Sequence, residues 1–385
     1  MLAAVRDHLE GTLEHELAAR EAAAFVHVCT ARDPELQYCL RVARAGDTTS
    51  AGNVPAADHE PAADHGPTAR TRYALAYVPD EGWLVRSTAD GSDPADDLAS
   101  DLVDLDLAET LLTPAHLPHD AALYLEDAGF SLASSDVLER TRATKTGGER
   151  ERIEAAQAAA SKGLRAAASM LAEATAADRS DSSDGVDPLT LEDAELTPER
   201  LRRAVDEAIV AAGAFPAGNT RIEPATDHGT LRPGEPIVVT VAPREPGGYH
   251  GGLTRTLVVD PDGGQERRAH VAVTRAFRSS EAMLTADVQS VTAVEADLEA
   301  EIRSFGFPDP DDAAGTVAGV GLEPSGPPID RARDIGPGSV VRLEAAARVE
   351  DGGWVRIADL LAVEDDGVAW LESPSRSLEP SALLE

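Results

Sequence analysis

The feature that most constrains the fold of this chain is a hairpin signal at residues 237 to 256, which read IVVTVAPREPGGYHGGLTRT. An apolar run rich in β-branched residues, 237 to 239, precedes a turn rich in proline and glycine, and a second strand-like run, 253 to 256, follows it. Two such runs joined by turn-forming residues are typical of an antiparallel β-hairpin. The sequence therefore predicts a two-stranded hairpin at this point.

Length and hydrophobic content predict two domains. The chain has 385 residues, of which 42% are hydrophobic, and a single core rarely serves more than about 250 to 300 residues. A long Ala-rich stretch with good helix propensity begins shortly after residue 140. We therefore expect one domain at residues 1–140 and a second at residues 141–385.

In residues 1–140, helix-like and strand-like segments alternate, which is typical of a small α/β domain. A flexible insertion is expected at about residues 45 to 70, where the pentapeptide PAADH occurs twice among Gly, Thr and Asp. The predicted elements are a helix at residues 2 to 24, strands at 25 to 29 and 36 to 42, a hairpin at 73 to 78 and 83 to 85, and a helix at 115 to 129.

In residues 141–385, long helical patterns surround the hairpin and a second pair of strands. A threonine followed by Pro-Glu at residues 197 to 199 has the composition of a helix start. The predicted elements are helices at residues 149 to 175, 197 to 212 and 265 to 304, and strands at 339 to 349 and 354 to 364.

The charge of the chain indicates a strongly acidic, solvated surface. The formal net charge is −35, from 69 acidic and 34 basic residues, and Lys145 and Lys162 are the only lysines. At molar salt, charges are screened within about 3 Å, so self-repulsion is suppressed there. The composition therefore indicates a salt-adapted, halophilic protein. It argues against a nucleic-acid partner, because phosphate binding needs a basic footprint.

The cysteines and the N-terminus indicate a cytoplasmic protein. Cys29 and Cys39 are ten residues apart and form no CxxC pair, so we expect inert buried thiols. The N-terminus lacks a basic stretch followed by an apolar one, and no apolar run approaches about 20 residues. Neither secretion nor a membrane partner is expected.

Five stretches carry motifs of a known family. Residues 248 to 256 are similar to GYxSDxTRT, residues 317 to 328 to GHGxGLxxHExP, residues 335 to 344 to PGxxxxxE, residues 354 to 359 to GxRIED, and residues 142 to 156 to the opening of a catalytic domain. The chain thus resembles the creatinase/aminopeptidase/prolidase (pita-bread, M24-type) metallopeptidases, in particular Xaa-Pro aminopeptidases, over residues 140 to 380. The resemblance implies an α/β fold with a creatinase-like N-terminal domain and a pita-bread domain, in which helices pack outside a curved antiparallel sheet.

The same resemblance implies a site for two divalent metals such as Mn, Co or Zn, held by two Asp, one His and two Glu. The flanking motifs place these five ligands at Thr240, Gly252, Ala318, Glu344 and Ala358, so Glu344 alone is retained. Ser325 stands where the family has a further, catalytic histidine, and no histidine follows His270.

We therefore expect no metal, no cofactor and no catalytic residue. Four lost ligands at about tenfold each weaken metal binding by at least about 5.5 kcal/mol. A relocated metal site built from Asp227, His228, Glu245, His250 and Asp359 is the alternative. The residues expected to line the former active site are Thr240, Tyr249, His250, Gly252, Arg255, Ala318, Ser325, Glu344, Arg356 and Ala358.

Glu344 is expected to contact an arginine, because burial without a cation raises the pKa of a carboxyl group unless a partner charge compensates. Arg255 and Arg356 flank the former site and are the two candidates.

Three functional hypotheses follow from the resemblance. The first is a metal-free, inactive homologue that binds a peptide or protein terminus in its cleft. The second is an active metal-dependent Xaa-Pro aminopeptidase or dipeptidase with rearranged ligands. The third is a structural dimer partner of an active paralogue. The resemblance also implies a homodimer.

Overall fold

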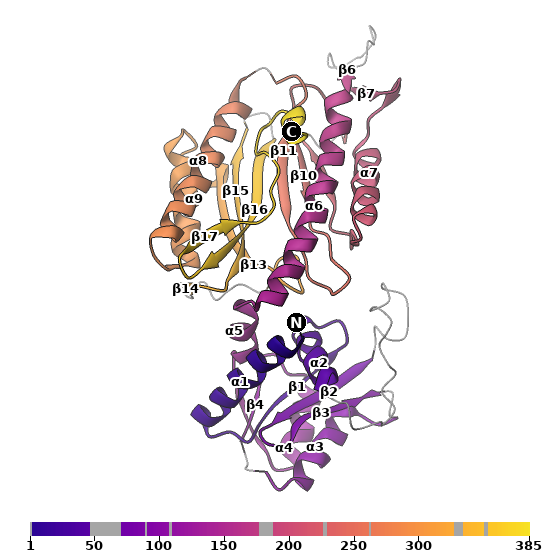
Figure 1. The fold of residues 1–385 in the computed structure, drawn as a ribbon, viewed down its shortest axis with the longest axis vertical. Coiled ribbons are helices and arrows are strands. Elements are labelled where there is room, and N and C mark those ends of the chain that lie inside the picture. Colours follow the sequence, from indigo (N-terminus) through magenta and orange to yellow (C-terminus); the bar gives the residue numbers. More distant parts are fainter. Residues whose placement is uncertain are drawn as a thin grey trace. The chain divides into compact units, whose positions relative to one another are not determined.

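The computed structural model (Figure 1) describes residues 2–46, 71–88, 91–107, 110–176, 188–225, 229–261, 263–326, 334–349 and 353–385. Within the described residues the chain forms two compact units, Met1–Gly148 and Glu149–Glu385. Both units combine helices and strands, so the expected α/β class is confirmed. The insertion expected at residues 45 to 70 lies, apart from the end of one helix, outside the described residues.

The first unit is built on a mixed sheet of strand order β3-β2-β1-β4-β5. Its centre pairs β1 antiparallel with β2 and parallel with β4, and the apolar residues of these strands pack with helices α3 and α4 in one core. The strands are β1 (Ala24–Thr30), β2 (Arg72–Val78), β3 (Gly82–Ser87), β4 (Thr110–Thr113) and β5 (Ser131–Ser134), and the helices are α1 (Leu2–Arg20), α2 (Pro34–Gly46), α3 (Pro94–Asp104), α4 (His119–Asp127) and α5 (Val137–Ala143).

The strand predicted at residues 36 to 42 is wrong, because this segment belongs to helix α2. Asp33 caps the helix, and its Oδ1 accepts a hydrogen bond from the backbone N–H of Leu36 at 2.8 Å. Pro34 occupies the first helical position, where a missing N–H leaves no bond unmade. Asp-Pro is therefore a helix start here, and the apolar residues after it recur at helical spacing.

The second unit is built on an antiparallel sheet of order β13-β15-β16-β11-β10-β9, and β17 also pairs with β16. The predicted hairpin is present as β10 and β11, and the strands predicted at residues 339 to 349 and 354 to 364 are β15 and β16. The strands are β9 (Arg221–Pro224), β10 (Ile237–Val241), β11 (Leu253–Leu257), β13 (Ala313–Gly319), β15 (Val340–Arg348), β16 (Trp354–Glu364) and β17 (Gly367–Trp370).

Helices pack against one face of this curved sheet (Figure 1). Helices α6 (Gly147–Glu173) and α7 (Pro198–Ala211) share a core with β10 and β11. Helices α8 (Gln265–Ala286) and α9 (Val291–Ser304) share a core with β15 and β16. We call the side of the sheet that the helices cover the outer face. The opposite side, to which every second residue of a strand points, is the inner face. Helices outside a curved antiparallel sheet are the arrangement that the resemblance implies.

Short strands complete the second unit. Strands β6 (Thr175–Ala176), β7 (Leu189–Leu191) and β8 (Ala194–Glu195) form a small separate sheet, and β12 (Gln289–Ser290) pairs with β14 (Asp334–Ile335). The single helix predicted at residues 265 to 304 is wrong, because the segment forms two helices, α8 and α9, with a non-helical connection between them. Ser290 caps the second helix by accepting a hydrogen bond from the N–H of Ala293 at 3.2 Å. None of the helices in the described ranges combines the length and the apolarity needed to cross a bilayer.

Candidate functional site

The strand register brings the expected ligand positions to the inner face of the second unit's sheet. Thr240 pairs with Thr254, Thr254 with Ala358, and Ala358 with Glu344, so these four residues form a row across β10, β11, β16 and β15. Paired residues on neighbouring strands point to the same side of a sheet. Three of the five family ligand positions therefore share one row.

Arg342 occupies the space beside the missing ligands. It pairs with Ala318 on β13, and a Cβ added at Gly252 would lie 3.3 Å from its Cδ. Arg342 Nη2 donates a hydrogen bond to Thr254 Oγ1 at 3.0 Å. Its Nη1 lies 2.5 Å from Glu344 Oε2. The guanidinium thus lies between the position of the second aspartate and the one retained ligand.

Glu344 contacts a second arginine, as expected from the sequence. Arg356 Nε lies 3.4 Å from Glu344 Oε1, and Arg356 Nη1 donates to Glu223 Oε2 at 3.2 Å. Thr240 Oγ1 lies 3.1 Å from Thr254 Oγ1. Arg342 was not expected as a partner of Glu344. We call the following connected residues the inner-face network: Glu223, Arg356, Glu344, Arg342, Thr254 and Thr240.

Arg255 lies on the outer face, so the expectation that it could pair with Glu344 is wrong. Its side chain is 0% exposed, and Nη2 lies 2.6 Å from Asp359 Oδ1. The same nitrogen donates to Ser373 Oγ at 2.6 Å and to the carbonyl oxygen of Pro374 at 2.9 Å. Arg255 therefore fastens the segment that follows β17 to the sheet and does not line the inner face.

Arg376 completes this buried cluster on the outer face. Its Nε donates to Asp359 Oδ2 at 2.5 Å. Its guanidinium lies 4.7 Å from the ring centroid of Phe277 and 4.4 Å from that of Trp370, within the range of cation–π attraction. Asp359 is thus held by two arginines, which removes it from any relocated metal site.

The turn between β10 and β11 is held by the carboxylate of Glu245. This carboxylate accepts hydrogen bonds from the backbone N–H groups of Gly247 at 2.7 Å and Tyr249 at 3.0 Å, and from Arg152 Nη1 at 2.8 Å. The hydroxyl of Tyr249 donates to Glu149 Oε1 at 3.1 Å. Glu245 and Tyr249 therefore shape the turn.

His250 is a buried, neutral imidazole. The residue is only 5% exposed, and its Nδ1 is 3.3 Å from the carbonyl oxygen of Ala242. Burial, helped by the charge of nearby Arg244, lowers the pKa of His250 to about 4, against the opposing effects of that hydrogen bond and of Glu245. The group is therefore uncharged at neutral pH.

Among the described residues, the remaining candidates do not assemble a metal site. Ser325 is exposed, Ala358 is fully buried, and Asp227 and His228 lie outside the described residues. In the part of the chain that the structure describes, no group of three or more His, Cys, Asp or Glu side chains is arranged to hold a metal ion. Two divalent cations do not fit this inner face, because a permanent cation, Arg342, already holds the retained carboxylate.

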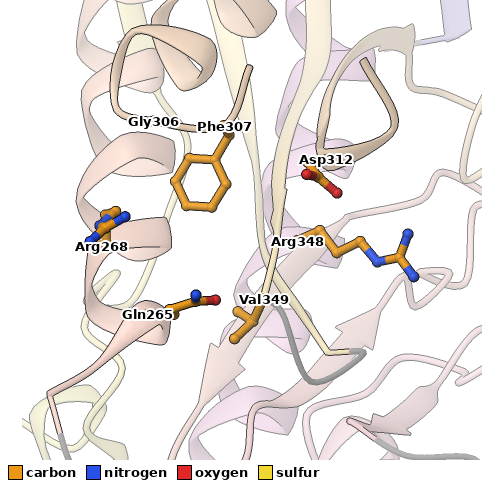
Figure 2. A pocket seen from close by; sticks show the side chains of 7 residues that line it. All are labelled: Gln265, Arg268, Gly306, Phe307, Asp312, Arg348 and Val349. Atoms are coloured by element: carbon orange, nitrogen blue, oxygen red, sulfur yellow. The ribbon is translucent and has the colours of Figure 1, made fainter. Parts of the chain in front are cut away.

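A hollow of about 270 Å³ lies elsewhere in the second unit (Figure 2). No residue of the inner-face network lines it. Figure 2 shows Gln265, Arg268 and the ring of Phe307 on one side, and Asp312 and Arg348 on the other. The hollow is lined by Gln265, Arg268, Gly306, Phe307, Asp312, Arg348 and Val349. It is no part of the candidate site.

Comparisons with known proteins bear on the same unit. A sequence model of Metallopeptidase family M24 matches residues 151–365. The chain is similar to the prolidase from Pyrococcus horikoshii OT3, at 16% identity and a TM-score of 0.70, over 96% of this chain and 99% of that one. The Xaa-Pro dipeptidase from Bacillus anthracis matches at 13% identity and a TM-score of 0.67, over 98% and 99% of the two chains.

Proline aminopeptidase P II from Yersinia pestis matches at 14% identity and a TM-score of 0.65, over 100% of this chain and 99% of that one. No curated protein sequence matches the chain significantly. At these identities, the likeness to solved structures shows a shared fold.

Proposed function

Because the chain belongs to metallopeptidase family M24, we propose that it is a metal-independent member of this family that does not hydrolyse peptides. In this proposal its inner face binds a peptide or protein terminus. The family's divalent metals would need oxygen or imidazole ligands at five positions, and four of these positions hold Thr240, Gly252, Ala318 and Ala358. Glycine and alanine have no side-chain atom that can coordinate a metal. The loss of ligands therefore affects the whole site.

The observation that supports the proposal best is the position of Arg342. Its guanidinium lies 2.5 Å from Glu344 and beside the space above Gly252. Arginine cannot be deprotonated in proteins, so its charge is permanent. A divalent cation placed there would meet a like charge and would share one carboxylate with it. The chain therefore supplies from its own sequence a positive charge beside the retained ligand.

The test of the proposal is the metal content and the activity of the natural chain. We expect protein purified in molar KCl to contain no bound transition metal and to leave an X-Pro peptide uncleaved when Mn, Co or Zn is added. Two metals per chain together with turnover would support the alternative, an active Xaa-Pro aminopeptidase or dipeptidase with rearranged ligands.

A second experiment asks whether Arg342 itself excludes the metals. We expect the substitutions Thr240→Asp, Gly252→Asp, Ala318→His and Ala358→Glu to restore two bound metals only when Arg342→Thr is added. The matched control carries the same four substitutions with Arg342 intact, and circular dichroism checks that both chains fold. Two metals bound to the folded control would show that Arg342 does not exclude them.

A further inference from the structure

The inner-face network differs in charge from the rest of the molecule. The chain carries 69 acidic and 34 basic residues. The network holds two glutamates, Glu223 and Glu344, and two arginines, Arg342 and Arg356, which are 16% and 27% exposed. On an acidic protein, this part of the inner face is therefore balanced in charge, and its two arginines are partly exposed.

The two arginines of the network offer more hydrogen-bond donors than their partners use. Each guanidinium has five N–H groups, and carboxylates and hydroxyls accept them. Arg356 donates through Nη1 to Glu223. Its Nε is buried and, although it is close to Glu344, has no hydrogen-bonded partner in the described part of the chain. The guanidinium of Arg356 therefore has donor capacity that an added acceptor could use.

We propose that the network binds the α-carboxylate of a peptide C-terminus, held by Arg356 and Arg342. This proposal rests on the proposed binding function and specifies its ligand. Arginine matches the planar carboxylate with a fork of donors. The network already contains an example, because the carboxylate of Glu344 lies between the two guanidiniums.

Glu223 is the residue that the ligand displaces. Its side chain is 45% exposed, and its ion pair with Arg356 has a single nitrogen–oxygen contact of 3.2 Å. A partly exposed pair of this kind contributes little free energy. An incoming carboxylate can therefore take over the donors of Arg356, while the exposed Glu223 turns towards solvent.

The same contacts disfavour other charged ligands. A peptide N-terminus is a cation and would meet the charges of both arginines, which already share Glu344. A phosphate dianion would meet the charges of both glutamates, whereas a carboxylate brings one negative charge. The network therefore favours a singly charged anion.

The experiment compares two pools of random tetrapeptides without Asp and Glu. One pool is acetylated with a free C-terminus, and the other has a free amine and an amidated C-terminus. Equilibrium dialysis against the full chain at one fixed KCl concentration, with mass spectrometry, measures retention of each pool. We expect retention of the free-acid pool and loss of retention when the C-terminus is amidated.

Variants of the network supply a second readout. We expect Glu223→Gln to bind the free-acid pool roughly 2- to 5-fold tighter, because it removes the competing carboxylate. We expect Arg356→Gln to bind it at least about tenfold weaker. Arg303→Gln is the control, because Arg303 forms an exposed pair with Glu299 on α9, and its binding should equal that of the natural chain.

The outcomes separate the two proposals. Retention of the amidated pool alone overturns the carboxylate proposal and leaves terminus binding standing. Retention of neither pool overturns both. Weaker or unchanged binding by a folded Glu223→Gln chain also overturns the carboxylate proposal, because removal of an acidic residue should favour an anion.

Discussion

Two arginines of the second unit show that the face of a strand decides what a charged residue does. Arg255 is fully buried on the outer face, where its guanidinium pairs with Asp359 and donates to nearby oxygens. Arg356, on the neighbouring strand, lies on the inner face and is 27% exposed. The first residue stabilises the fold from within, whereas the second is partly open to solvent.

This difference predicts opposite outcomes for the same substitution. Arg255→Met should lower the free energy of unfolding by about 3 to 5 kcal/mol, because it leaves the charge of buried Asp359 with one arginine fewer. Arg356→Met should change it by less than about 1 kcal/mol. Urea denaturation of both variants at one salt concentration measures the difference. Equal losses would contradict the assignment of the two faces.

His250 predicts a pH dependence of stability. Its pKa is about 4 in the folded chain, below its usual value of 6.5, so the unfolded chain binds the proton more tightly. Above pH 6.5 the effect is absent, and as the pH falls from 6.5 towards 4 about 3 kcal/mol of stability is lost. Denaturation at pH 7 and pH 5 should show a smaller decrease for His250→Gln than for the natural chain. The pKa of His270 is lowered in the same direction, mainly by burial, so part of the decrease remains.

At the scale of elements, the hairpin is fitted closely to helix α6. A Cβ added at Gly251 would lie 2.7 Å from the backbone carbon of Ala156 and from the backbone nitrogen of Gln157. The N–H of the next residue, Gly252, donates to Gln157 Oε1 at 2.8 Å. The two glycines therefore face different neighbours, a rigid helix backbone and the flexible side chain of Arg342.

The paired substitutions test this fit. Gly251→Ala should lower the free energy of unfolding by about 1 to 3 kcal/mol, because the helix backbone cannot move aside without repacking. Gly252→Ala should cost less than about 1 kcal/mol, because Arg342 can shift by a few tenths of an ångström. Thermal or urea unfolding compares them, and a Gly252→Ala chain as unstable as Gly251→Ala would contradict the prediction.

The main elements of the second unit could be predicted from the sequence, because turn chemistry and apolar runs act locally. The hairpin and the pair β15 and β16 are such cases. The strand predicted at residues 36 to 42 is wrong because a short apolar run does not by itself distinguish a strand from a buried helix, and Asp33 and Pro34 start a helix here. The break between α8 and α9 was missed because it spans only residues 287 to 290, and the helical pattern resumes directly after the capping Ser290.

The candidate site could be predicted only in part. The motifs locate Glu344 and the lost ligands, and the contact of Glu344 with Arg356 followed from charge balance. Arg342 was missed, although its position two residues before Glu344 in a strand places both on one face. The same alternation points Arg255 to the outer face and its neighbour Thr254 to the inner face. A position within a motif therefore does not reveal the direction of a side chain.

At the scale of the whole molecule, the net charge of −35 predicts that salt stabilises the fold. Repulsion among surface carboxylates is stronger in the compact chain, and raising the salt from 0.1 M to 1 M shortens the screening length from about 10 Å to about 3 Å. The melting temperature should therefore rise with KCl. Scanning calorimetry along a KCl series measures this, and a melting temperature that falls with KCl would contradict a salt-adapted surface.

The buried cluster around Arg255 has a consequence for protein synthesis. Arg255 and Pro374, which share a hydrogen bond, are separated by 119 residues in the chain. A ribosome adding about 5 to 20 residues per second needs roughly ten seconds to cover that distance. During this interval the guanidinium has no acceptors from residues 373 to 376 and cannot be buried without a large cost. The outer face of β11 around Arg255 therefore cannot be completed until the segment that follows β17 has been synthesised.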